Sequence, residues 1–192
     1  MPKPNVREQI VAAGLATLHG KGFNATSVQD ITEAAGVPKG SFYNHFDSKD
    51  ALGAEVVQRY RAAGAARRAV LKDSKLSPLV RLRRYFEALN QIGTESGFTR
   101  GCLLGNFGSE LANQSPLIRS QVHEAFETWT ADLAAVLAEA QRAGEVAKDL
   151  PAKSIAAFLV NAWQGSVMRA KVEHDRAPLD LFLKVTLAKV LV

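Results

Sequence analysis

The chain has 192 residues, of which 47% are hydrophobic and 22% are charged, a composition that excludes a disordered or low-complexity protein. No uncharged apolar stretch approaches the roughly 18 residues of a membrane span, and the first residues lack the apolar region of a secretory signal. The single cysteine excludes an internal disulfide framework and a multi-cysteine metal site. We therefore expect a cytoplasmic protein with no membrane contact and no metal or other cofactor.

The net charge of +5 is unevenly distributed. Residues 59–84 carry nine basic side chains against Asp73 alone, whereas residues 1–58 and 85–192 are each slightly acidic. A concentrated basic stretch indicates an anionic partner. A solvated helix face followed by a linker explains the same charges equally well.

Glycine, proline and capping residues divide the N-terminal part into short helices, which we expect at 7–19, 26–35 and 39–45. Thr26, with Gln29 three residues later, matches a capping box that opens the second of them. Gly36 permits the positive φ that often ends such a helix, and Pro38 stands where a first helical residue is favoured.

Longer amphipathic helices are expected in the rest of the chain, at 49–72, 78–92, 102–112, 117–143, 151–174 and from 178 onward. Residues 93–101 are expected to form a loop. Alanine, leucine and arginine recur and β-branched runs are scarce, so no strand is predicted. The sequence predicts an all-α fold of about nine to ten helices, with a helix-turn-helix head at 1–60 and a helical body at 61–192.

Residues 26–46 have the layout of a helix-turn-helix. The apolar side chains that can share one small core are Val28, Ile31, Val37, Phe42 and Phe46. The outer face of the second helix is then left with Lys39, Gly40, Ser41, Tyr43, Asn44 and His45. These residues suit groove edges and phosphates. Gly40 is costly inside a helix, by about 1 kcal/mol relative to alanine, and either close approach to DNA or tight packing on the first helix would explain it.

Residues 7–60 resemble the DNA-binding head of TetR-type transcriptional regulators. The motifs that carry the resemblance are Gly22-Phe23, Thr26-Ser27-Val28, Ile31, Ala35-Gly36-Val37, Lys39 to Phe46 and Ser48 to Leu52. Membership implies a homodimeric, sequence-specific DNA-binding repressor of a near-palindromic, double-stranded operator, released by a small-molecule inducer.

The resemblance implies DNA contacts at Thr26, Ser27, Lys39, Gly40, Ser41, Tyr43, Asn44, His45 and Lys49. Tyr43 and His45 match phosphate contacts in the family. Thr26, Ser27 and Lys49 lie at predicted helix starts, where free N–H groups bind phosphate.

The resemblance also implies an effector pocket in the body. Cys102, Asn106 and Glu110 fall near one face of the helix predicted at 102–112, which is thinned by three glycines. A polar stripe of this kind suits a pocket wall, although close packing of a glycine-rich helix on a neighbour explains it equally well. The candidate pocket residues are Tyr85, Phe98, Cys102, Asn106, Phe107, Glu110, Phe126, Trp129, Trp163 and Lys171. For each aromatic, core packing is the competing interpretation.

TetR-type bodies pair their last long helices with those of a partner subunit. Apolar or small residues on the helix predicted at 151–174 are Ile155, Phe158, Leu159, Ala162, Trp163, Ser166 and Met168. The preceding long helix offers Phe126, Trp129, Leu133, Val136 and Leu137. A dimer interface and a buried intrachain core both explain these surfaces.

Gly101 to Leu104, Ala170 to Val172 and Pro178-Leu179 further resemble a subgroup that includes NemR-type regulators, which sense electrophiles through a cysteine at this place. A helix N-terminus, and Lys171 if it lies nearby, would favour the reactive thiolate of Cys102. The alternative function is therefore a thiol-based repressor, and the alternative role of Cys102 is core packing.

Catalysis is not expected. The four histidines have no pair at metal-ligand spacing, and no nucleophile motif or phosphate loop accompanies them. The least favoured function is a DNA-binding protein without an effector.

Overall fold

The computed structural model describes residues 5–191, and within that range every regular element is a helix. The α-helices are α1 (Val6–Lys21), α2 (Val28–Ala35), α3 (Lys39–Tyr43), α4 (Lys49–Ala63), α5 (Ala65–Arg68), α6 (Pro78–Glu95), α7 (Leu103–Leu111), α8 (Pro116–Ala143), α9 (Ala152–Glu173) and α10 (Ala177–Val185). A 3-10 helix, η1 (Ala69–Lys72), follows α5, and a π-helical segment, η2 (Thr186–Val190), follows α10. The predicted all-α fold is confirmed. None of the described helices is long and apolar enough to cross a membrane.

The helices pack as two compact units. The first contains the chain up to Ala63 together with Leu103–Ala125, so α7 and the first part of α8 belong with α1 to α4. The second contains Gly64–Cys102 and the chain from Phe126 onward. The sequence-based division into 1–60 and 61–192 stays a prediction of domain organisation.

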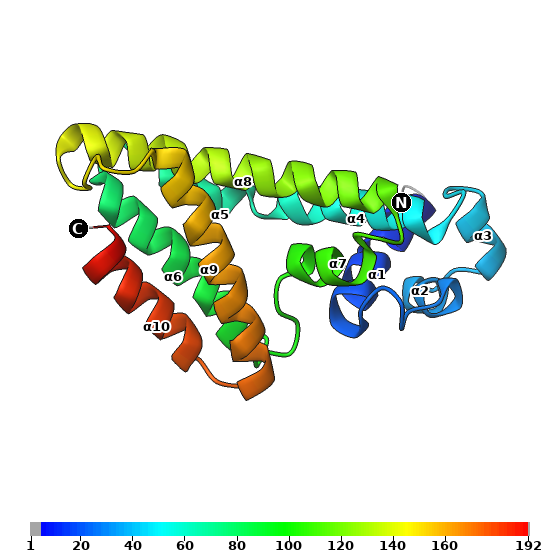
Figure 1. Cartoon of the computed structure of the whole chain (residues 1–192). Coiled ribbons are helices and arrows are strands. Elements are labelled where there is room, and N and C mark those ends of the chain that lie inside the picture. The colour runs from blue at the N-terminus through cyan, green and yellow to red at the C-terminus, as the bar shows by residue number, and fades with distance from the viewer. Residues whose placement is uncertain (1–4, 192) are drawn as a thin grey trace. The chain divides into compact units, whose positions relative to one another are not determined.

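In the first unit, α1, α2 and α3 pack against one another (Figure 1). The fully buried side chains there include Ile10, Leu18, Ile31, Phe42 and Leu52. Gly53 lies where α4 meets α8, because a Cβ at this position would stand 2.8 Å from Ile118 Cδ1 and 2.9 Å from the ring of Phe23. The core of the first unit therefore depends on a glycine at position 53.

Two of the predicted helix boundaries are wrong. The helix expected over 49–72 ends at Ala63, and Gly64 separates it from α5 and η1. Glycine costs about 1 kcal/mol in a helix relative to alanine, so a break there is inexpensive. Gly93, expected in a loop, instead lies inside α6, where it leaves room for the side chains of Leu179 and Phe98.

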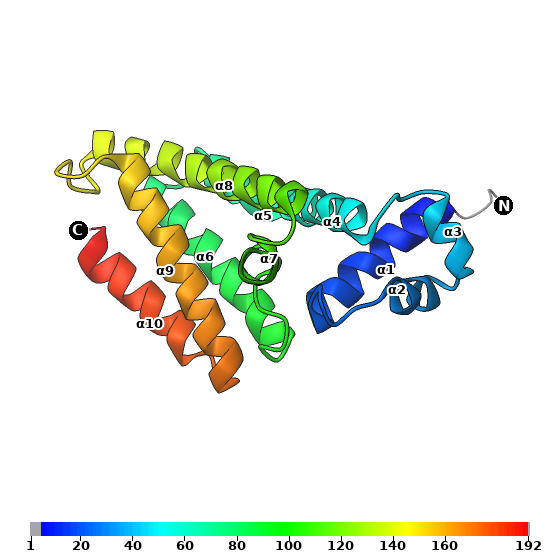
Figure 2. The same ribbon diagram turned by 45° about the vertical axis from the view of Figure 1, so that its right-hand side comes forward.

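In the second unit, α6, α9 and α10 run side by side (Figure 2). Fully buried Asn90 on α6 connects them, because its side-chain amide donates to the backbone oxygen of Leu179 at 3.3 Å and accepts from Trp163 Nε1 at 3.0 Å. Buried amides are costly unless they are paired, so this arrangement fixes the relative position of the three helices.

Candidate nucleic-acid interface

Helix α3 is held by one apolar side and presents the other to solvent. Phe42 is fully buried, and its ring centroid lies 5.6 Å from that of Phe46, which is 5% exposed. Ser41 is half-buried. The exposed residues of this segment are Lys39, Gly40, Tyr43, Asn44 and His45. The outer face predicted for the second helix of the helix-turn-helix is thus present in the fold.

Gly40 has no packing role within the described residues. Apart from its two chain neighbours and the backbone of its own helix, no described atom lies within 4 Å of the position that a Cβ would take. Tight packing on the first helix therefore does not explain this glycine. Of the two explanations that the sequence offered, the close approach of another molecule remains.

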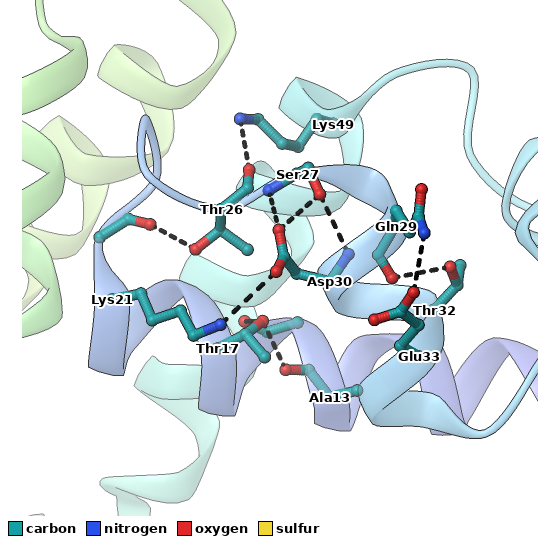
Figure 3. A network of polar contacts seen from close by, with 12 residues as sticks. Ala13, Thr17, Lys21, Thr26, Ser27, Gln29, Asp30, Thr32, Glu33 and Lys49 are labelled. Atoms are coloured by element: carbon teal, nitrogen blue, oxygen red, sulfur yellow. Dashed lines mark hydrogen bonds and ion pairs between the residues drawn. The ribbon is translucent and has the colours of Figure 1, made fainter.

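The capping box of α2 begins at Ser27 rather than Thr26 (Figure 3). The Ser27 hydroxyl accepts from the Asp30 N–H at 3.1 Å, and the Asp30 carboxylate accepts from the Ser27 N–H at 2.8 Å. Hydrogen bonds from the Ser27 side chain and backbone, with a smaller contribution from Lys21, lower the pKa of Asp30 from 3.8 to about 2. The start of α2 therefore carries a permanent negative charge near neutral pH, which opposes phosphate at Ser27.

Thr26 and Lys49 have structural roles. Thr26 is buried, and its hydroxyl donates to the backbone oxygen of Gly22 at 2.7 Å, which gives the side chain a structural role; its predicted phosphate contact stays a prediction. The Lys49 ammonium donates to the backbone oxygens of Phe23 and Thr26 at 3.0 and 2.8 Å and lies 4.3 Å from the Phe23 ring centroid. Lys49 therefore holds the loop before α2, and its predicted phosphate contact stays a prediction.

Arg7 is a positioning residue that the sequence did not reveal. Its guanidinium makes two hydrogen bonds to the Glu55 carboxylate and lies 5.1 Å from the ring centroid of Phe46, directly after α3. The arrangement joins the start of α1, the middle of α4 and the end of α3. Residues 48 positions apart in sequence carry no local pattern that predicts such a pair.

Helix α7 also contacts the loop before α2. The Glu110 carboxylate accepts from the Asn24 N–H at 2.9 Å, and the Phe107 ring centroid lies 5.7 Å from that of Phe23, edge to face. Asn106 is half-buried in the same unit. Both side chains thus pack on the first unit, and their predicted place in an effector pocket stays a prediction.

Three of the predicted pocket aromatics do come together in the second unit. The rings of Phe126 and Trp129 are stacked at 6.5 Å, and those of Trp129 and Trp163 meet edge to face at 5.3 Å. The Trp163 N–H donates a hydrogen bond to Asn90, whereas the buried Nε1 of Trp129 has no hydrogen-bond partner among the described residues. Tyr85 is also buried, and its burial raises the pKa of the phenol well above its usual range.

Cys102 immediately precedes α7 and is 4% exposed. Its sulfur accepts a hydrogen bond from Gln164 Nε2 on α9 at 3.2 Å. Lys171 lies on α9 two turns beyond Gln164 and is half-buried. Phe98 occupies the loop before Cys102 at a φ of 59°, with its ring against Gly93. Deep burial limits the access of reagents to the thiol.

An apolar groove with a volume of about 460 Å³ is lined by residues of α9 and α10. The large hydrophobic side chains exposed on these two helices are Phe158, Met168, Val172, Leu181 and Val185. By contrast, Trp129, Leu133, Val136 and Leu137 of α8 and Ile155, Leu159 and Trp163 of α9 are buried within the chain. The interface interpretation is thus wrong for those residues, and the exposed apolar surface lies on α9 and α10.

Groups of three or more side chains able to hold a metal ion do not occur among residues 5–191. The described site therefore consists of a solvated helix face on a small helical core, with a separate aromatic cluster in the second unit. Such a helix face suits groove edges and phosphates rather than bond-making chemistry.

Comparison with known proteins also indicates DNA binding, and one matched relative spans the whole chain. Residues 10–56 match the model of bacterial regulatory proteins of the tetR family, and residues 78–186 match the tetracyclin repressor-like C-terminal domain. The transcriptional repressor DhaR of Mycobacterium sp. strain GP1 is 39% identical over 192 residues, covering 100% of this chain and 95% of DhaR. The repressor NemR of Escherichia coli K12 is 28% identical over 183 residues, covering 92% and 89%.

A solved structure of a regulatory protein TetR from Rhodobacter sphaeroides superposes with a TM-score of 0.90 at 33% identity, covering 96% of this chain and 98% of that one. The resemblance to NemR noted from the sequence is therefore a relationship within the family, and DhaR is more similar than NemR. The chain belongs to the TetR family and is a DNA-binding transcriptional repressor, not an enzyme.

Proposed function

We propose that the protein acts in the cytoplasm as a homodimer that binds a near-palindromic operator through α3 and releases it when a small-molecule inducer binds the body. The observation that carries the DNA-reading role is the outer face of α3. Tyr43 is 57% exposed there, and Gly40 stands in open space within the described residues. Glycine costs about 1 kcal/mol in a helix relative to alanine, and no packing within the described residues accounts for it here, so contact with another molecule explains it best.

The proposal gives each exposed residue a role. Lys39, Tyr43 and His45 contact phosphates, because each offers a donor on a side chain that reaches beyond the helix backbone. Asn44 and half-buried Ser41 are short hydrogen-bonding residues that suit base edges in the major groove. Gly40 lets the backbone approach the DNA. Ser27 is exposed at the start of α2, but its neighbour Asp30 makes it the weakest of the candidates.

The groove between α9 and α10 supports the dimer. Phe158 and Leu181 are 53% and 56% exposed beside it. Apolar surface of this extent on two adjacent helices is unusual for a monomer. A second copy presenting the same face would bury it in a two-fold symmetric contact, and a dimer supplies the two reading heads that a near-palindromic operator requires.

Leu181→Glu tests the dimer. A carboxylate buried at a self-complementary contact occurs twice in the assembly, so we expect a monomer by light scattering and a loss of operator binding. Leu150→Glu is the matched control, because Leu150 is 55% exposed but lies in the loop before α9. A dimer that survives Leu181→Glu would contradict this interface.

The aromatic cluster supports the inducer site. Phe126, Trp129 and Trp163 provide large apolar faces, and the unpaired N–H of Trp129 could donate to an acceptor on the ligand. The alternative, in which Cys102 reacts with electrophiles, is less well supported, because the thiol is buried and bonded to Gln164.

The experiment that tests the function measures binding to the DNA beside the protein's own gene by fluorescence anisotropy, with and without a mild thiol-reactive quinone. We expect tight binding that unlabelled operator competes away and that the quinone leaves unchanged. Release by the quinone in the parent protein, but not in Cys102→Ser, would instead support the thiol-based repressor. An absence of operator binding would contradict the proposal.

A further inference from the structure

A second hollow of the described chain lies entirely within the second unit, between η1, the start of α6 and the middle of α8. Its volume is about 260 Å³. It differs from the aromatic cluster in its lining, which includes several charged side chains. Neither the sequence motifs nor the DNA-reading face gives this hollow a role.

Arg81, on the first turn of α6, is the central residue of this hollow. It is only 5% exposed, which is rare for an arginine. Its Nη1 donates to the backbone oxygen of Leu71 at 2.9 Å, and its Nη2 donates to the Glu139 carboxylate. Its Nε is buried and has no hydrogen-bond partner among the described residues. A buried donor without an acceptor is costly, so the site is incomplete as it stands.

The charges around Arg81 favour an anion. Arg68 forms an ion pair with Asp132 at 3.5 Å, and Arg81 pairs with Glu139. Lys72 adds a third cation to the lining, so that positive charges exceed carboxylates by one. A water molecule would also satisfy the Arg81 donor, but the excess of positive charge in the lining favours an anionic oxygen over water.

The remaining lining sets the size and character of the anion. Ser74 offers a hydroxyl. Leu71 and Val136 are buried apolar residues, and Ala135 also lines the hollow. A lining that combines cations with aliphatic side chains matches a molecule with an anionic group and an apolar part.

We propose that this hollow binds a small organic carboxylate with a short aliphatic tail. The carboxylate accepts the Nε–H of Arg81 and interacts with the Lys72 ammonium, and the tail packs against Leu71 and Val136. This site is distinct from the proposed inducer cluster and does not depend on the proposed mode of operator release, because its occupancy can be measured without DNA.

The test is isothermal titration of the full-length protein with butyrate, its neutral analogue butyramide, and inorganic phosphate. We expect saturable binding of butyrate alone. Butyramide lacks the charge, and phosphate lacks the tail. Binding of phosphate but not butyrate would overturn the carboxylate assignment, equal binding of butyrate and butyramide would overturn the role of the charge, and no binding of any of the three would overturn the site.

Variants locate the binding without disturbing the core. Lys72 and Ser74 are both exposed, so Lys72→Met and Ser74→Ala leave buried packing intact. Replacement of Arg81 would instead remove the ion-pair partner of Glu139. Loss of one partly solvated charge is expected to raise the Kd for butyrate about threefold to fivefold in Lys72→Met. Lys75→Met, which removes the same charge from an exposed position outside the lining, is the control. Equal losses in Lys72→Met and Lys75→Met would overturn the location.

Discussion

Tyr43 and Trp163 are both large aromatic residues with one polar group, and the molecule uses them in opposite ways. Tyr43 is 57% exposed on the outer face of α3. Trp163 is 5% exposed, and its N–H is satisfied by Asn90. An exposed aromatic on a short helix stabilises the isolated chain little, so its presence points to an intermolecular role. A buried and satisfied aromatic already has its explanation in packing.

The same contrast divides the residues that the family resemblance singled out. In the first unit, no packing contact within the described residues accounts for Gly40 on the exposed outer face of α3. In the second unit, Tyr85, Trp129 and Trp163 of the predicted pocket are also part of the core, and only the Nε1 of Trp129 lacks a hydrogen-bond partner among the described residues of this cluster. Functional residues on a surface are thus separable from structural ones by exposure, whereas pocket residues inside a helical body are not.

The largest expected effect comes from Phe107, which the sequence assigned to the pocket and the structure assigns to packing against Phe23. Phe107→Ala is expected to lower the free energy of unfolding by about 3–5 kcal/mol, because it removes a buried ring and leaves a cavity. Urea unfolding followed by circular dichroism measures this. Leu150→Ala, at an exposed loop position, is the control and should change stability by less than about 0.5 kcal/mol. A decrease of less than about 1 kcal/mol in the free energy of unfolding of Phe107→Ala would contradict the packing role and support a place for Phe107 in the wall of a pocket.

The second effect separates function from stability at Gly40. Gly40→Leu should not destabilise the free protein, because no described atom lies near its Cβ position and leucine favours helix more than glycine does. Operator affinity should fall at least about tenfold, or 1.4 kcal/mol, because the new side chain prevents close approach to DNA. Anisotropy titration and thermal melting of the same sample measure both quantities.

Tyr43→Phe is the matched companion, because it keeps the bulk of the face and removes one hydroxyl. If that hydroxyl meets a phosphate, binding to every DNA sequence should weaken alike, by a factor of about five or less. A change in base preference in Tyr43→Phe would contradict the phosphate role.

For Gly40→Leu, an unchanged operator affinity would show that α3 does not contact the DNA.

The fold and the outer face of α3 were predictable, because both depend on local patterns. The apolar spacing of Ile31, Phe42 and Phe46 determines which side of α3 is buried, and Gly36 ends α2 at a φ of 67° as predicted. Local patterns also assign local partners. The sequence places a threonine and a serine in succession at the start of α2, and only the loop geometry decides that Ser27 caps the helix while Thr26 turns inward to Gly22.

The contacts that were not predicted join residues far apart in the chain. Lys49 reaches back to Phe23, Glu110 reaches Asn24, and Arg7 reaches Glu55. Each of these side chains has the polarity of a surface residue, and its sequence neighbours do not indicate its partner. The spacing of Cys102, Asn106 and Glu110 predicted one shared stripe, but Cys102 precedes α7 and contacts Gln164, whereas Glu110 binds the loop before α2.

The smallest effect concerns the carboxylate that closes the start of α2. Hydrogen bonds from Ser27 lower the pKa of Asp30 from 3.8 to about 2, so the folded protein favours the ionised form. The stabilisation is fully present above the unfolded pKa and is lost as the pH falls through about 2. Asp30→Asn should therefore melt at a lower temperature than the parent protein at neutral pH, with the difference shrinking between pH 4 and pH 2. Melting curves across this range, with Asp149→Asn as an exposed loop control, measure it. A difference that stays constant down to pH 2 would show that the stability of α2 depends on the shape of the Asp30 side chain and not on its charge.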